Sequence, residues 1–162
     1  LMGQLLAFAG MLESKYVSWL PAYGPEMRGG TANCSVNISD EPIGSPVVSK
    51  ATSVIVMNRP SLDKFESAVQ PGGMLFINSS IIDRKAERDD IQVFYVPCNE
   101  IAEQLGNARV ANVVMLGAYI EKTKCVEMEN ILNALLEKLG KTKAHLIPLN
   151  REALVKGAES VR

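Results

Sequence analysis

One carboxylate and one guanidinium stand close together in a stretch rich in glycine and proline. Glu26 and Arg28 are separated by one residue and lie between Gly24-Pro25 and Gly29-Gly30. Glycine permits backbone conformations that other residues resist, and proline stiffens a loop. A loop of this kind can present an acid and a base to a ligand, and Tyr23 at its start belongs to the same candidate site. The alternative is a tight crossover with an exposed ion pair.

A second group of candidates consists of asparagines at the ends of apolar runs. Asn58, Asn78 and Asn99 each end or follow a run typical of a buried strand. The carboxyl ends of parallel strands share one edge of a sheet, and open α/β proteins bind ligands there. Helix N-termini at that edge favour amide or phosphate groups. The three asparagines are therefore predicted to line a binding edge, unless each only caps the helix that follows it.

The remaining reactive side chains give weaker signals. Arg109 can hold a carboxylate or phosphate, although a surface cation near a helix end is the more common role. His145, the single histidine, has no acidic or cysteine partner near it in sequence, which favours a structural role. Cys34 and Cys98 are interpreted as buried packing residues. Because the sequence contains no nucleophile elbow, Walker motif or zinc pattern, it identifies no catalytic residue and no metal site.

Composition excludes several classes of protein. The chain has 162 residues and a formal net charge of −1, so nothing attracts it as a whole to nucleic acid or to an anionic membrane. No apolar run reaches the ~18 residues of a membrane span. The three cysteines are dispersed, which favours a reducing, cytoplasmic compartment. The chain begins at Leu1, which suggests a true N-terminus upstream, and its apolar start lacks the features of a signal peptide.

The elements that must position these groups alternate between strands and helices. Strands are expected at 16–20, 32–38, 53–57, 74–78, 91–96 and 145–149. Helices are expected at 3–12, 61–69, 110–121, 127–139 and from Arg151, with a further helix that starts at Cys98 or Asn99 and ends at Leu105. Residues 83–90 are expected to form a solvated, charged loop. This order predicts one α/β domain over residues 1–162, with a layered, mixed but mostly parallel sheet and helices packed on it.

Motifs along nearly the whole chain resemble the gamma subunit of the 2-oxoacid:ferredoxin oxidoreductases. The first is Tyr-Gly-Pro-Glu-Met-Arg-Gly-Gly-Thr-Ala-Asn-Cys at residues 23–34, and the others follow in the family's order. They lie at 38–46, 57–65, 71–73, 96–102 and 105–112. The resemblance implies a fold like domain III of pyruvate:ferredoxin oxidoreductase, and it identifies residues 1–162 as a single gamma-type domain.

The resemblance implies part of a larger enzyme. Family members convert a 2-oxoacid to an acyl-CoA and pass electrons to ferredoxin, and 2-oxoglutarate or a branched-chain 2-oxoacid is the favoured substrate here. Thiamine diphosphate, Mg and iron–sulfur clusters normally lie on the alpha, beta and delta chains, so this chain is expected to be inactive alone. The 24–30 loop is placed near the coenzyme A path, where Arg28 contacts a CoA phosphate or a neighbouring subunit. The isolated chain is expected to form a homodimer.

One departure from the family's pattern concerns the start of the chain. Family members begin with a strand and a Gly-x-Gly-Gly-Gln-Gly loop, which can cradle phosphate at the start of the first helix. This sequence begins at Leu1, inside or just before that helix, so it carries no residues of such a site. Two alternatives stay open: a non-catalytic scaffold that assembles other chains or binds a nucleotide, and an indolepyruvate-specific relative.

Overall fold

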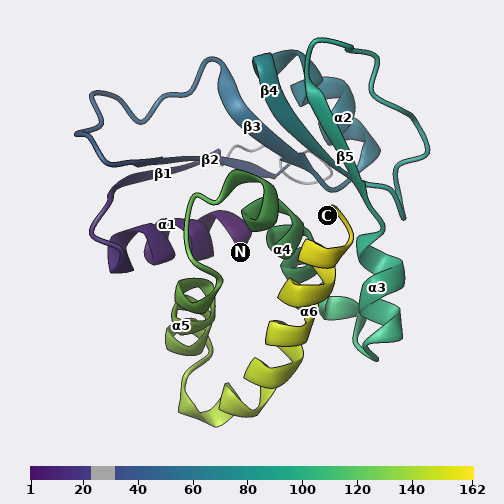
Figure 1. Cartoon of the computed structure of the whole chain (residues 1–162). Coiled ribbons are helices and arrows are strands. Elements are labelled where there is room, and N and C mark those ends of the chain that lie inside the picture. The colour runs from purple at the N-terminus through teal and green to yellow at the C-terminus, as the bar shows by residue number, and fades with distance from the viewer. Residues whose placement is uncertain (23–31) are drawn as a thin grey trace. The chain divides into compact units, whose positions relative to one another are not determined.

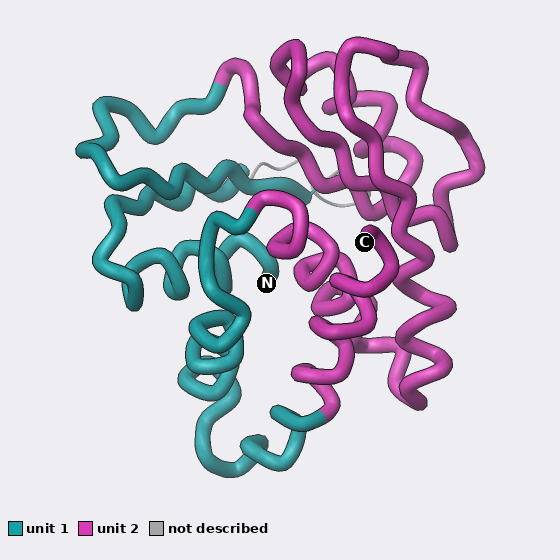
Figure 2. Tube along the Cα trace, in the orientation of Figure 1, with its two compact units in different colours: residues 1–48, 124–148 teal, residues 49–123, 149–162 magenta. Residues whose placement is uncertain are grey.

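The computed structural model describes residues 1–22 and 32–162 of the chain (Figure 1). The described elements, in order, are α1 (Met2–Leu12), β1 (Tyr16–Ala22), β2 (Asn33–Ser39), β3 (Ala51–Val56), α2 (Arg59–Phe65), the 3₁₀ helix η2 (Glu66–Ala68), β4 (Val69–Asn78), β5 (Gln92–Val96), α3 (Cys98–Gln104), the 3₁₀ helix η3 (Ala108–Val110), α4 (Ala111–Thr123), α5 (Met128–Leu139), the 3₁₀ helix η4 (Lys141–Leu146) and α6 (Ile147–Glu159). They fall into two compact units, residues 1–48 with 124–148 and residues 49–123 with 149–162 (Figure 2).

The first unit packs α1 on an antiparallel pair of strands. Strands β1 and β2 pair with Tyr16 opposite Ser39 and Ala22 opposite Asn33. Gly10 faces this pair, since a Cβ there would lie 2.8 Å from a methyl group of Val17. The absence of a side chain at Gly10 therefore lets the helix approach the strands closely.

Glu13 joins the end of α1 to the start of α5 within the same unit. Its Oε1 accepts hydrogen bonds from the Glu127 amide at 2.6 Å and from Asn130 Nδ2 at 3.0 Å. Lys15 Nζ donates to the Cys125 carbonyl oxygen at 2.8 Å. Burial raises the pKa of the Glu13 carboxyl, but these hydrogen bonds and the Lys15 charge lower it further, so the net shift is downward. The carboxylate therefore stays ionised and serves as a fixed acceptor at the start of α5.

The second unit contains a parallel sheet in the order β3-β4-β5. Successive side chains of a strand point to opposite faces, so the two faces of β4 have different neighbours. Leu75 and Ile77 join a buried cluster with Leu62 of α2 on one face. Phe76, from the other face, stacks on Phe94 with ring centroids 5.0 Å apart. Continuous apolar runs in the strands thus produce a sheet that is covered on both faces, as parallel sheets require.

Several predicted elements differ from the structure. The strand expected at 145–149 is wrong, because η4 ends at Leu146 and α6 begins at Ile147. The helix expected to reach Val69 ends earlier, and β4 begins at that residue. Cys34 is exposed rather than buried, whereas Cys98 is buried as predicted. The antiparallel strands also form a sheet of their own, separate in its pairing from the parallel one.

Candidate functional site

Six of the candidate site residues lie outside the described part of the chain. They are Tyr23, Gly24, Glu26, Arg28, Gly29 and Gly30. The candidates that the structure describes are Asn58, Asn78, Asn99 and Arg109. All four belong to the second unit, so their positions can be compared directly.

Asn78 and Asn99 meet at the carboxyl edge of the parallel sheet. Asn78 is the last residue of β4, and its Nδ2 donates to Asn99 Oδ1 at 2.9 Å. Its Oδ1 accepts from the Ser80 amide at 3.3 Å. Ser80 Oγ in turn accepts from the Asn99 amide at 3.1 Å and from the Glu100 amide at 3.3 Å. The prediction that polar residues gather at this edge holds for this pair, and much of their hydrogen-bonding capacity is used within the protein.

Asn58 follows β3 at the same carboxyl edge, whereas Arg109 lies farther along the chain, after α3. The Asn58 side chain accepts a hydrogen bond from the Ser61 amide at 3.0 Å and thereby caps α2. Capping was the alternative role for this residue, and it is the one that the structure shows. Arg109 lies in η3, where its amide donates to Asn107 Oδ1 at 3.0 Å. In the described part of the chain, neither residue is hydrogen-bonded to the Asn78–Asn99 pair.

The Asn78–Asn99 pair and Ser80 are uncharged side chains joined by hydrogen bonds at the carboxyl edge. Cys98 starts the helix beside it, and burial raises the pKa of its thiol to about 12. That thiol stays protonated at neutral pH and is not an activated nucleophile. Within residues 1–22 and 32–162, no group of three or more His, Cys, Asp or Glu side chains is arranged to hold a metal ion. The described edge can orient a polar ligand through amides and hydroxyls.

Replacing Asn78 with alanine is expected to destabilise the protein by about 1–3 kcal/mol. Asn78 is fully buried, and its loss leaves Asn99 Oδ1 and the Ser80 amide without this partner. Urea unfolding followed by circular dichroism measures the change. Asn133→Ala, at an exposed position of α5, is the matched control and is expected to change stability by less than ~0.5 kcal/mol. Equal midpoints for the two variants would contradict the prediction.

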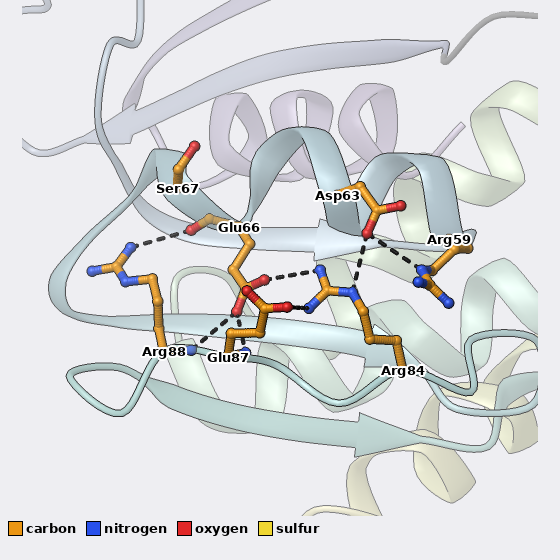
Figure 3. A pocket seen from close by; sticks show the side chains of 7 residues that line it. All are labelled: Arg59, Asp63, Glu66, Ser67, Arg84, Glu87 and Arg88. Atoms are coloured by element: carbon orange, nitrogen blue, oxygen red, sulfur yellow. Dashed lines mark hydrogen bonds and ion pairs between the residues drawn. The ribbon is translucent and has the colours of Figure 1, made fainter.

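A charged cluster that the sequence did not predict lines a surface depression of about 380 Å³ in the second unit (Figure 3). Its residues come from α2, η2 and the loop before β5, and they are Arg59, Asp63, Glu66, Ser67, Arg84, Glu87 and Arg88. Arg84 connects the cluster, since its Nε lies 3.0 Å from Asp63 Oδ1 and its Nη2 lies 2.9 Å from Glu66 Oε2. The loop at 83–90, predicted to be merely solvated, is thus tied to α2 and η2.

Glu66 is the buried acid of this cluster, with 8% of its surface exposed. Burial raises the pKa of its carboxyl, but hydrogen bonds from Arg84 and from the Glu87 and Arg88 amides lower it further. Its pKa in the folded protein is therefore below the ordinary value. The stabilisation is present above the unfolded-state pKa and is lost as the pH falls through the folded-state pKa.

A parallel α/β unit with a polar carboxyl edge is a ligand-binding architecture as a class. The chain belongs to the pyruvate ferredoxin/flavodoxin oxidoreductase family, whose family model matches residues 1–160. It is 42% identical over 116 residues to the ketoisovalerate oxidoreductase subunit VorA of Methanothermobacter marburgensis, with 72% of this chain and 24% of VorA covered. The chain spans a quarter to a third of the length of the VorA proteins that it matches.

Two solved structures share the fold. One is the gamma subunit of a keto/oxoacid ferredoxin oxidoreductase from Geobacter sulfurreducens, with a TM-score of 0.83, 26% identity and coverage of 99% of this chain and 89% of that chain. The other is a 2-oxoglutarate:ferredoxin oxidoreductase from Magnetococcus marinus with 2-oxoglutarate, coenzyme A and succinyl-CoA bound. Its TM-score is 0.88 at 20% identity, with coverage of 99% of this chain and 28% of that chain.

Within residues 1–22 and 32–162, no helix combines the length and the apolar character that crossing a membrane requires.

Proposed function

We propose that this chain is the gamma-type component of a multi-subunit 2-oxoacid:ferredoxin oxidoreductase. The observation that carries the proposal is the family match over residues 1–160, almost the whole chain. The likeness to the Geobacter gamma subunit, which is covered nearly end to end, supports the assignment of a separate subunit. Residues 1–162 then act as one gamma-type domain of the complex, in the cytoplasm.

The substrate is a 2-oxoacid, with 2-oxoglutarate or a branched-chain acid favoured, and the product is an acyl-CoA. Similarity to VorA supports the branched-chain assignment, and coenzyme A is a ligand of the Magnetococcus enzyme whose fold this chain shares. The dispersed cysteines Cys34, Cys98 and Cys125 do not suit an iron–sulfur cluster. The clusters, thiamine diphosphate and Mg are therefore assigned to companion alpha, beta and delta chains, which pass electrons to ferredoxin.

Reconstitution tests the proposal. The chain is co-expressed with its neighbouring genes through an affinity tag, and the purified material is assayed for CoA-dependent reduction of ferredoxin by several 2-oxoacids. A complex with activity that is lost when this chain is omitted is the expected result. Turnover by this chain alone would contradict the proposal, and an active complex that uses only indolepyruvate would support the indolepyruvate-specific alternative. Light scattering on the isolated chain tests the homodimer.

Replacing Arg28 with alanine in that complex is expected to raise the KM for CoA by about tenfold or more. The reason is that a guanidinium placed on a CoA phosphate contributes charge-assisted hydrogen bonds that alanine cannot make. Steady-state kinetics at varied CoA concentration measure the change, with subunit stoichiometry checked in the same preparation. Arg162→Ala, whose guanidinium pairs with Glu121 at 3.1 Å, is the matched arginine control and should leave the KM unchanged. Unchanged kinetics with weakened assembly would favour the scaffold role.

A further inference from the structure

The connection between the parallel strands β4 and β5 contains no helix. Residues 79–91, all of them described, join the two strands through turns, bends and irregular backbone, whereas most parallel crossovers use a helix. Two apolar residues, one near each end of this connection, hold it to the core: Ile82, which is 3% exposed, and Ile91, which packs against the same cluster. We call residues 83–90, which lie between them, the strap.

The strap has very little apolar content. Ala86 is its single apolar residue, and the other seven positions are Asp, Glu, Lys or Arg. Ala86 packs against the cluster, and its amide donates to the Tyr95 hydroxyl oxygen at 3.1 Å. Lys85 Nζ lies 5.0 Å from the centre of the Tyr95 ring. Hydrophobic burial therefore holds the two ends of the connection firmly and contributes little to the strap itself.

The Glu66 carboxylate is the main point of attachment (Figure 3). Its Oε1 accepts hydrogen bonds from the Glu87 amide at 2.6 Å and from the Arg88 amide at 3.2 Å. Its Oε2 accepts from Arg84 Nη2 at 2.9 Å. One side chain in η2 thus binds two consecutive backbone amides and one guanidinium of the strap. Among the described residues, no other side chain accepts as many hydrogen bonds from the strap.

Side chains of the strap also bind groups outside it. Arg88 Nη1 donates to the Glu66 carbonyl oxygen at 3.1 Å and also to the Val69 carbonyl oxygen. At the other end, Arg59 Nη1 lies 3.2 Å from Asp83 Oδ1. These contacts are directional and polar, and all of them can be replaced by water when the strap moves away.

We propose that the strap opens and closes as a local unit, with Glu66 as its catch, while the parallel sheet and the core beneath it stay folded. Opening exchanges protein hydrogen bonds for hydrogen bonds to water, and it exposes little apolar surface. The buried Ile82 and the packed Ile91 keep both ends in place. Local openings of this kind have free energies well below that of global unfolding. The proposal stands independently of the assigned enzyme complex.

Hydrogen–deuterium exchange of the full chain, read by mass spectrometry, tests the proposal. In the unmodified protein, the Glu87 and Arg88 amides are expected to exchange through openings that are insensitive to low urea, whereas β4 and β5 amides exchange through larger, urea-sensitive unfolding. Glu66→Ala should then speed exchange within 83–90 by about 10- to 100-fold, because hydrogen bonds to a charged acceptor are lost. Amides of β4 and β5 should change by less than about threefold.

Glu87→Gln is the matched control. Its side chain is 81% exposed and lies 3.6 Å from Arg84 Nη1, while its backbone amide keeps the bond to Glu66. The control should leave exchange in the strap close to that of the unmodified protein. Limited trypsin digestion gives a second measurement, since Arg84, Lys85 and Arg88 are cleavage sites. Trypsin should cut the Glu66→Ala variant within the strap before it cuts elsewhere in the chain.

Two results would overturn the proposal. The first is exchange of the strap amides of the unmodified protein at the same rate and with the same urea dependence as β4 and β5. The second is a Glu66→Ala variant in which strap and sheet lose protection equally. The first result needs no variant, so the test stands even if Glu66→Ala does not fold.

Discussion

Replacing Gly157 with alanine is expected to destabilise the second unit by about 3 kcal/mol or more, because the new methyl group has no room. Gly157 of α6 faces α4, and a Cβ there would overlap the carbonyl oxygen of Val114. Gly117 of α4 is its counterpart, since a Cβ on it would overlap the carbonyl oxygen of Leu154. The obstruction on both sides is backbone rather than a side chain that can rotate away. The helices must therefore separate to accept the methyl group.

Thermal and urea unfolding measure this loss, with Gly44→Ala as the matched control. A Cβ at Gly44 meets nothing within 4 Å, and its φ is outside the left-handed region. The control should be neutral within ~0.5 kcal/mol. Gly117→Ala should resemble Gly157→Ala. The double variant should lose less than the sum, because both residues lie where α4 and α6 approach each other and one separation of the helices relieves both overlaps. A Gly157→Ala variant as stable as the control would show that α4 and α6 do not cross this closely.

The sequence correctly predicted the elements whose hydrophobic pattern fits only one type of secondary structure. The run at 53–57 is apolar at nearly every position, which suits a parallel strand covered on both faces, and β3 lies there. Apolar residues of 127–139 recur at helical spacing, and α5 was found there. The run at 145–149 is short, and a short apolar run suits a strand or a helix equally well. In the structure the run is helical: its first two residues belong to η4, and α6 begins at Ile147 and continues through the rest of it.

The candidate site was predictable to the same limited degree. Two residues after neighbouring parallel strands must lie near each other, so the proximity of Asn78 and Asn99 followed from topology. The contact between Glu66 and Arg84 joins residues 18 positions apart through two side chains, and no local period encodes it. A weak signal was present in the alternation of Arg84, Ala86 and Arg88, which is the period of an extended segment with one face turned inward.

Replacing Phe76 with alanine is expected to cost about 3–5 kcal/mol, the range found for buried aromatic residues. Phe76 is 0% exposed and lies in β4, the central strand of the parallel sheet. Its ring stacks on Phe94 and meets Tyr119 edge to face at a centroid distance of 5.2 Å. The Tyr119 hydroxyl is 2.8 Å from Ser53 Oγ, so removing the ring also loosens the contact between α4 and β3.

The single tryptophan allows the loss of stability to be followed separately in the two units. Trp19 lies in β1 of the first unit, so its fluorescence reports that unit, while circular dichroism reports the helices of both units. If the units unfold separately, Phe76→Ala should lower the urea midpoint of the dichroism signal more than that of the fluorescence signal. If the units unfold together, the variant should lower both midpoints equally. Phe8→Ala, at a position that is 37% exposed on α1, is the control and should cost about 1–2 kcal/mol, clearly less than Phe76→Ala. A Phe76→Ala variant as stable as this control would refute the packing of β4 against α4, since a cavity of that size in a closed core cannot be neutral.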